Sequence, residues 1–366
     1  MSGDWAGRAG TVEDAIRRRF VRRLAGVVPG TRIGRVRWPR PLVIRPWPWH
    51  YWWQAHLLDC LVDAHRRAPQ PWRAVEISGL ARTVRLRNFG SWTNDYYDDI
   101  AWFGLAVQRA GPLARRSTQP ALTAITTRLR TGWTPAGGGG IWWRRGDNFK
   151  NAPANGPAAI LAARTGDLEF AARITDWMTD TLVDPHTGLV RDGVRLNPDG
   201  TIGAVEATTY TYCQGVYLGA CVELAERDGH PRWTDRAAIL LVAISARMVG
   251  PDGVIPGFDD GGDGGLFNGI LARYLADTAV RRPELAALAA PLVLASAEAA
   301  WQGRIDLDHP IDGGPAFAPD WRRPARTPRP GVPEADLSVQ LSAWMLLEAA
   351  ARTASAAAPP ASTAPS

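Results

Sequence analysis

Six stretches of this chain are apolar on nearly every face of a helix, and they alternate with stretches that are more charged and amphipathic. The apolar stretches begin near residues 51, 94, 151, 209, 264 and 336. A helix that is apolar all round is a buried helix. The alternation therefore predicts an all-α fold, an (α/α)6 barrel in which six inner helices are surrounded by outer ones.

The chain divides by composition into three parts. Residues 1–48 form a basic, partly irregular segment with a candidate helix at 11–25, residues 49–352 form the predicted barrel domain, and residues 353–366 form an Ala/Pro/Ser/Thr-rich tail expected to be disordered. In such a barrel the inner helices run the same way. Their N-terminal ends then share one face, where side chains distant in sequence converge.

Two adjacent carboxylates, Asp98 and Asp99, open the second apolar stretch. Neighbouring positions on a helix lie about 100° apart, so both side chains can reach one cleft. Paired carboxyl groups about 5–5.5 Å apart are what a retaining glycosidase needs. An alternative is that acids in a first turn only complement the helix dipole, with Thr93 or Asn94 as the cap. The predicted convergence of inner-helix ends favours the catalytic interpretation.

The chain contains seventeen Trp residues, whose flat apolar faces suit sugar rings. Trp102, Trp142 and Trp143 are candidates for lining sugar subsites, with core packing as the alternative. The Gly-rich run 137–140 predicts a mobile loop that carries the last two. Polar candidates for contacts to sugar hydroxyls also lie at predicted inner-helix starts: Asn151, Asn155, Tyr210, Gln214, Asp259 and Asp260.

Charge and cysteine content argue against several other classes of protein. The net charge is +6 and the N-terminal segment is rich in Arg, but no nucleic-acid-binding motif follows it. Weak contact of this segment with an anionic membrane surface is a remaining expectation. The sequence shows no secretory signal and no run of 18 apolar residues. The spacing of the cysteines fits neither a disulfide between Cys213 and Cys221 nor a metal site, so we expect a cytoplasmic protein without cofactor or metal.

Several motifs occur in an order that resembles glycoside hydrolase family 76, the endo-α-1,6-mannanases. The resemblance covers residues 49–350 and rests on these motifs: Trp52-Trp53-Gln54-Ala55, Tyr97-Asp98-Asp99 with Trp102, Gly140-Ile141-Trp142-Trp143, Lys150-Asn151 with Asn155, Gly188-Leu189-Val190 with Asp192-Gly193, Thr209-Tyr210 with Gln214-Gly215, and Phe267-Asn268-Gly269-Ile270 with Arg273-Tyr274. Trp52 and Phe267 therefore join the candidate substrate-binding residues. Cys213 departs from the pattern, because the family usually has Asn there.

The resemblance implies a retaining double displacement on an α-1,6-linked mannan or mannooligosaccharide, without metal. Asp98 would be the nucleophile and Asp99 the acid/base.

Two kinds of alternative remain at the level of sequence: a different enzyme on the same barrel, and a glycan-remodelling or glycan-binding protein with the same cleft. A sugar epimerase would need paired His bases, and a terpene cyclase would need Asp-Asp-x-x-Asp, whereas Trp102 stands at the last position of that motif here. A transglycosidase, or a non-hydrolytic protein that binds or remodels envelope glycans, would keep the same cleft. The sequence does not separate transglycosylation from hydrolysis, because both would use the same two aspartates.

Overall fold

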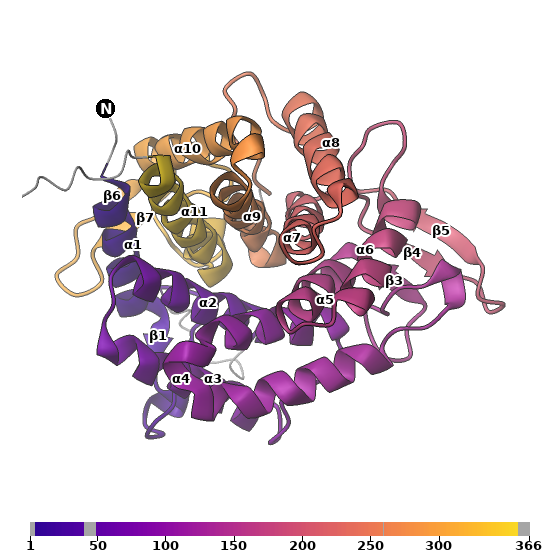
Figure 1. Cartoon of the computed structure of the whole chain (residues 1–366). Helices are drawn as coiled ribbons and strands as arrows, with labels where there is room; N and C mark the ends of the chain where they lie inside the picture. The colour runs from indigo at the N-terminus through magenta and orange to yellow at the C-terminus, as the bar shows by residue number, and fades with distance from the viewer. Residues whose placement is uncertain (1–3, 40–48, 259, 358–366) are drawn as a thin grey trace, which may run out of the picture.

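The structure is a computed structural model that describes residues 4–39, 49–258 and 260–357. Six inner helices form a closed ring in which each contacts the next and the last contacts the first (Figure 1). They are α2 Tyr51–Arg67, the first half of α4 Tyr97–Thr131, α5 Ala152–Arg164, α7 Thr211–Arg227, α9 Phe267–Arg281 and α11 Leu337–Ala357. The predicted (α/α)6 barrel is confirmed.

The outer ring contains one helix for each inner helix. Its members are α1 Trp5–Phe20, α3 Pro71–Arg87, the second half of α4, α6 Leu168–Leu182, α8 Pro231–Arg247 and α10 Ala286–Gly303. The burial patterns of the two rings differ as expected. Every residue of α7 from Thr211 to Ala225 is buried, whereas α6 buries one stripe that includes Phe170, Ile174 and Met178. Helical periodicity thus sorted the helices correctly into two layers.

The N-terminal segment supplies the sixth outer helix. Helix α1 packs on α11, and its Trp5, Val12 and Ile16 belong to the main hydrophobic core. The helix begins at Trp5, earlier than the predicted residue 11, because Asp4 Oδ1 accepts a hydrogen bond from the backbone N–H of Gly7 and caps it. The domain boundary at residue 49 stays a prediction, but the segment before it shares the barrel's core.

Helix α4 unites two helices that the sequence predicts separately, at 94–110 and 113–130. The backbone is helical from Tyr97 to Thr131 except at Ala114, whose φ of −145° and ψ of 39° mark a kink between two helical halves. Pro112 lies just before this bend, and a proline inside a helix removes a hydrogen bond and kinks it. The two predicted helices therefore lie on either side of this kink, the first in the inner ring and the second in the outer ring.

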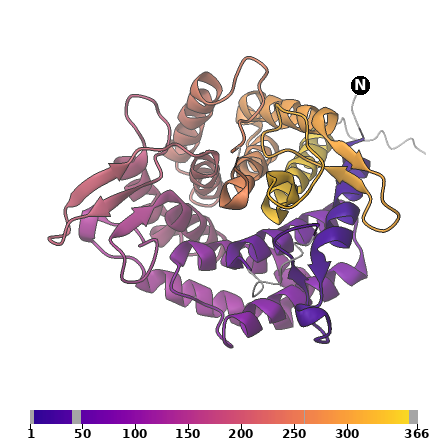
Figure 2. The same ribbon diagram turned by 180° about the vertical axis from the view of Figure 1, so that it is seen from behind.

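The fold also contains short antiparallel strands. A three-stranded sheet of β3 Phe149–Asn151, β4 Gly193–Leu196 and β5 Ile202–Glu206 projects from one side of the barrel, and Figure 2 shows it from behind. Two further antiparallel pairs are separate from this sheet: β1 Val21–Arg22 with β2 Ile33–Gly34, and β6 Ile305–Leu307 with β7 Gly314–Ala316. Strand β3 leads directly into α5, so the sheet is anchored to the start of an inner helix.

Buried ion pairs link the inner helices away from their N-terminal ends. Arg109 of α4 and Arg273 of α9 both pair with Asp59 and Asp63 of α2, with 2.6 Å between Arg273 Nη1 and Asp59 Oδ2. Burial raises the pKa of Asp63, but the two guanidinium charges outweigh burial and lower it.

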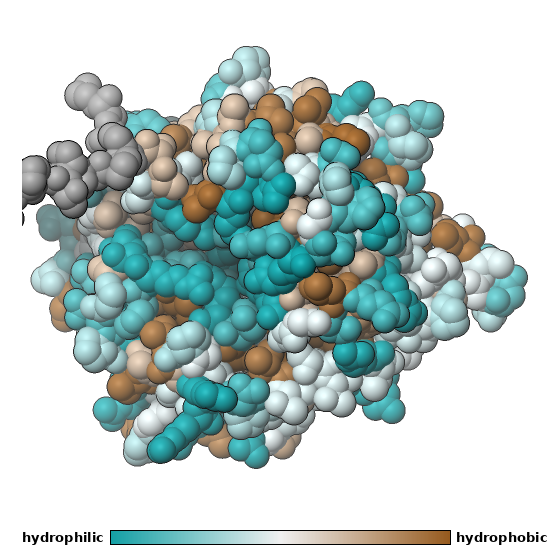
Figure 3. Space-filling view, viewed as in Figure 1, coloured by the Kyte–Doolittle hydropathy of each residue, from teal (hydrophilic) through white to brown (hydrophobic). Residues whose placement is uncertain are grey.

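One face of the molecule is hydrophilic around a hollow at its centre (Figure 3).

One stretch of the described residues, Pro283–Gly303, is long and apolar enough to span a membrane by length and composition alone. It contains α10, which packs against α9 and α11 through residues such as Leu292, Val293 and Ala297. In the apolar window 39% is buried inside the structure, so packing accounts for only part of its apolarity.

Candidate active site

The two predicted catalytic carboxyls lie in the first turn of α4. The flanking residues Tyr97, Ile100 and Ala101 are buried and fix the start of the helix, while Asp98 and Asp99 are half-buried. The backbone N–H of Asp99 donates to Asp98 Oδ1 at 2.8 Å. The first turn of a helix has free N–H groups, so this bond satisfies one of them and orients Asp98.

Trp143 holds the second oxygen of Asp98. Its indole Nε1 donates to Asp98 Oδ2 at 2.9 Å. The backbone of Trp143 is itself tied on both sides, since its N–H donates to Phe149 O at 2.8 Å and its carbonyl accepts from the N–H of Tyr97 at 2.9 Å. The indole donor is thus fixed relative to the start of α4, and Asp98 has a donor on each carboxylate oxygen.

Asp99 is held from the preceding loop. The side-chain amide of Asn94 donates to Asp99 Oδ2 at 2.8 Å, and Asn94 Oδ1 accepts from the backbone N–H of Tyr96. The sequence suggests Asn94 only as a possible helix cap. The structure shows that it orients the second carboxyl instead.

The surroundings of Asp98 and Asp99 act on the pKa of each carboxyl. Burial raises the pKa of Asp98 to about 7, against which the hydrogen bonds from Asp99 N–H and Trp143 act. Burial raises the pKa of Asp99 well above its ordinary value, and the charges of Asp98 and Asp263 raise it further. Two carboxylates this close do not both ionise readily, and the hydrogen bonds on both oxygens of Asp98 favour its ionised form beside a protonated Asp99.

Asp263 belongs to a segment far along the chain, yet it lies at the same end of the barrel as Asp98 and Asp99. It lies in the short 3₁₀ helix Gly262–Leu266 before α9, and its Oδ1 accepts from Trp52 Nε1 at 3.0 Å and from Trp53 Nε1 at 2.8 Å. Asp263 thus fixes the indole of Trp52, a candidate sugar platform. The sequence places Asp263 in a polar loop, but its two indole partners were not predicted.

The candidate aromatic residues from α2, α4, α7 and α9 form a connected group. The ring of Phe267 stacks on Tyr212 with 3.9 Å between centroids and also contacts Tyr210. Trp52 lies 6.5 Å from Phe267 and 6.3 Å from Trp102 by ring centroids. Trp102 is buried, whereas Trp52, Tyr210 and Phe267 are half-exposed and present surface for a ligand.

The predicted amide residues lie behind this surface. Asn155 is fully buried and bonds the backbone of Ile141 in both directions, and Gln214 does the same with Val190. Asn151 is also buried, and its Oδ1 caps α5 by accepting from the N–H of Ala154. These amide groups are occupied by backbone partners, because loops packed against inner-helix ends need buried acceptors and donors. The structure therefore places them in support of the site, not on its surface.

The Gly-rich run, which its composition predicts to be a mobile loop, is held by Lys150. Lys150, the only lysine of the chain, is buried and its Nζ contacts Thr134 O, Ala136 O and Gly139 O at 3.0, 2.7 and 2.6 Å. The same Nζ lies 4.4 Å from the centroid of the Trp142 ring. Trp142 thus contacts Lys150 and the core, whereas Trp143 reaches Asp98.

Two remaining candidates come from the loop before α9. Asp260 is exposed, and Asp259 lies outside the described residues.

Asp192 was not predicted as a site residue, although it lies in a family motif. It accepts from Tyr212 Oη at 3.4 Å, and burial raises its pKa to about 6. The signal that could have found it is its place beside Gly193 in the motif Gly188-Leu189-Val190 with Asp192-Gly193.

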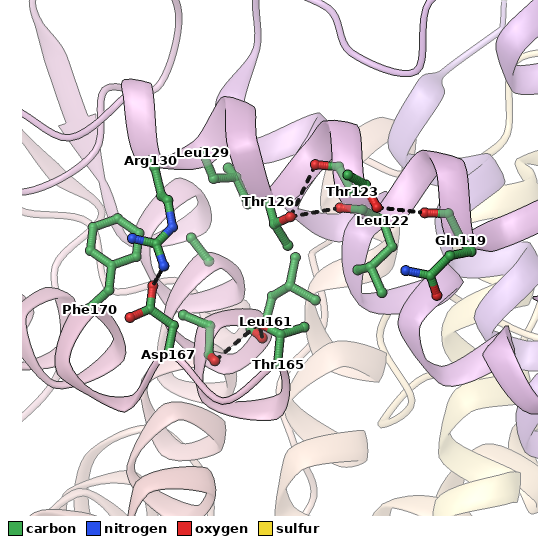
Figure 4. A pocket seen from close by; sticks show the side chains of 12 residues that line it. Gln119, Leu122, Thr123, Thr126, Leu129, Arg130, Leu161, Thr165, Asp167 and Phe170 are labelled. Carbon is green, nitrogen blue, oxygen red and sulfur yellow. Dashed lines mark hydrogen bonds and ion pairs between the residues drawn. The ribbon is translucent and has the colours of Figure 1, made fainter.

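A separate cavity of about 300 Å³ lies between the second half of α4 and helices α5 and α6 (Figure 4). The hydroxyls of Thr123, Thr126 and Thr165 around it donate to carbonyls of their own helices, and Arg130 pairs with Asp167 at its edge. Neither catalytic candidate lines it. These threonine hydroxyls are already engaged as donors, so we do not regard this cavity as the active site.

A helical barrel with two unequal carboxyls beside aromatic faces defines a glycosidase of the (α/α)6 class. The sequence matches glycosyl hydrolase family 76 over residues 11–327. The chain belongs to this family, as its motifs indicated.

Solved structures give the same result. The α-1,6-mannanase of this family from Salegentibacter sp. HEL1_6 is 30% identical, with a TM-score of 0.82 over 95% of this chain and 99% of that one. The Lin0763 protein from Listeria innocua is 27% identical, with a TM-score of 0.78 over 95% and 97%. Dfg5 from Chaetomium thermophilum, at 18% identity and a TM-score of 0.77 over 97% and 92%, shows the shared fold alone. No curated protein matches the chain.

Proposed function

We propose that this protein hydrolyses α-1,6-mannosidic linkages in a mannan-type glycan by a retaining double displacement. The observation that carries the proposal is the adjacent carboxyl pair, in which both oxygens of Asp98 accept a hydrogen bond and burial raises the pKa of both carboxyls. An inactive variant of the Salegentibacter mannanase, with two consecutive aspartates replaced by asparagine, was solved with α-1,6-mannotriose. That relative supports both the substrate class and the importance of an adjacent pair.

In the proposed first step, ionised Asp98 attacks the anomeric carbon of a mannosyl unit. The bond to the departing 6-oxygen breaks as Asp99 gives that oxygen its proton. The two hydrogen bonds to Asp98 hold the attacking oxygens in place, and the covalent glycosyl-enzyme removes the negative charge that had raised the pKa of Asp99.

In the second step, Asp99, now ionised, takes a proton from water as the water attacks the same carbon. The lower pKa that Asp99 has beside an esterified Asp98 suits this change from acid to base. Asp98 then leaves as the carboxylate, and the product keeps the α configuration.

The test is a panel of α-linked mannooligosaccharides followed by NMR. We expect cleavage of 1,6-linked oligomers in preference to 1,2- and 1,3-linked ones, with the α-anomer as the first product. A β-anomer as first product would contradict the role of Asp98. Products longer than the substrate, when an acceptor is added, would instead indicate a transglycosidase.

A further inference from the structure

Phe89, in the turn between α3 and α4, is displayed to solvent at a conformational cost. Its side chain is 101% exposed, and its backbone is left-handed with φ 53°, next to Gly90 with φ 84°. A left-handed backbone is rare and strained for a bulky residue, and Asn or Gly would occupy it more easily. Folding gains nothing from an exposed ring on a strained backbone, which suggests that the ring meets a partner.

The turn that displays Phe89 is closed by its own polar groups. Arg85 Nε donates to Gly90 O at 2.9 Å, the Asn88 amide donates to Thr93 O at 2.8 Å, and the Ser91 hydroxyl donates to the same carbonyl at 2.8 Å. The polar side chains beside the ring are therefore engaged within the turn. A sugar site needs free polar groups to hold hydroxyls, so these contacts argue against a glycan platform.

The surface next to Phe89 is apolar and basic. Near the end of α3, Leu86 is 51% exposed, and Arg82, one turn earlier, is also exposed. Within the described stretch 71–91, Glu76 is the only acid, and it is half-buried and pairs with Arg17 at 3.0 Å. A protruding aromatic ring beside arginines fits the boundary between lipid headgroups and acyl chains, where the ring enters the apolar side and the guanidinium groups meet phosphates.

We propose that Phe89, Leu86 and Arg82 form a docking site for an anionic lipid bilayer. The turn lies at the end of the barrel that carries the catalytic candidates, because Tyr51 Oη at the start of α2 donates to Trp92 O at 2.6 Å and Asn94 contacts Asp99. A bilayer bound here would lie beside the catalytic candidates. The site adjoins the Arg-rich N-terminal segment, where the backbone N–H of Arg32 donates to Gly79 O of α3 at 3.0 Å and Arg17 is engaged with Glu76.

The experiment is co-flotation of the full chain with phosphatidylcholine vesicles, with and without phosphatidylglycerol. We expect binding only to the vesicles with phosphatidylglycerol, and weaker binding at high salt. Phe89→Asn should weaken binding about tenfold, since the ring no longer enters the apolar region. Arg82→Gln should weaken it about fivefold.

Two controls separate docking from folding. The double variant Ile239→Ser, Val242→Ser removes a matched pair of exposed apolar residues on α8 and should bind as the wild type does. Phe89→Asn should melt at or above the wild-type temperature, because Asn tolerates the left-handed backbone.

Two results would overturn the proposal: no preference for phosphatidylglycerol, or equal vesicle binding by wild type and Phe89→Asn. If neither protein bound vesicles and Phe89→Asn lost mannan binding, the surface would be assigned to glycan and the proposal would be wrong. The readout is independent of turnover, so failure of the proposed mannanase activity would leave it intact.

Discussion

The indole Nε1 of Trp143 donates to Asp98 Oδ2 at 2.9 Å, joining residues 45 positions apart in the sequence. Asp98 also accepts from the Asp99 N–H, so one carboxylate of the pair is hydrogen-bonded as an anion. The second carboxyl is left to carry the proton. This hydrogen bond distinguishes the roles of two chemically identical neighbours, and different effects are expected when each is replaced.

Asp98→Asn and Asp99→Asn should each abolish most turnover of an α-1,6-mannan. For Asp99, the acid/base, the loss should be about 10²–10⁴-fold. The two variants should differ on an activated aryl mannoside, provided that the site accepts it. Asp99→Asn should still attack it, and azide should speed release of the intermediate, whereas Asp98→Asn should form no normal glycosyl-enzyme. Steady-state kinetics on both substrates is the measurement. Near-wild-type turnover of the natural glycan by either variant would refute the assignment.

Asp98→Asn should also stabilise the fold at high pH. Because the pKa of Asp98 is raised from 3.8 to about 7, the folded protein holds a proton that the unfolded chain releases, and the free energy of unfolding falls as pH rises through that window. The variant should thus melt above the wild type at pH values beyond about 7, with the difference vanishing below about 4. Thermal melts across pH test this, with Asp260→Asn as an exposed control. A purely dipole-complementing Asp98 predicts the opposite sign.

Trp143→Phe should move the acid limb of the kcat/KM profile to higher pH. The indole hydrogen bond favours ionised Asp98 and lowers its pKa, so its loss raises the pH at which the nucleophile ionises. Trp142→Phe is the matched control, because Trp142 faces Lys150 and should leave that limb in place. An unchanged acid limb in Trp143→Phe would show that the hydrogen bond does not tune Asp98.

Asp263→Asn should move both limbs of the profile to lower pH. The charge of Asp263 raises the pKa of Asp98 and of Asp99, and Asn removes that charge while keeping an oxygen to accept from Trp52. A pH–rate profile reports the pair as a whole, so the joint shift is the expected signature. Asp260→Asn serves again as the control. A large rise in KM without any shift would instead assign Asp263 only to holding Trp52.

Lys150→Met should destabilise the protein and lower turnover together. It leaves the carbonyls of Thr134, Ala136 and Gly139 without their donor, and hydrogen bonds to a charged group contribute about 1.5–3 kcal/mol each. The loop they form precedes Trp143, so loss of its anchor should disturb the Asp98 contact. Thermal melts and kcat measure the two effects, with Arg195→Met on the adjacent strand as a half-exposed control. A normal melting temperature would mean that the loop holds without Lys150.

Much of the fold could be predicted from periodicity. The starts of the inner helices were predicted to within a few residues, because apolar residues on every helical face are a strong local signal. The acids Asp98 and Asp99 also stood out, because two carboxylates are unusual at the start of a helix that is otherwise apolar. The start of α1 was misplaced because the cap is Asp4, whereas Thr11, at the predicted start, lies inside the helix and its hydroxyl donates to Gly7 O.

The sequence by itself therefore determined the layered helical architecture, the family and the candidate catalytic pair, since these depend on residue type and short-range spacing. Only the tertiary structure decided which polar groups face the cleft. Asn155 and Gln214 share the helical spacing of a binding residue, yet they are buried against loop backbone, while Asp263 and Asn94 meet the indoles and the second carboxyl. The physical reason is that a hydrogen-bond partner far along the chain leaves no local pattern, so such contacts exist only once the barrel has closed.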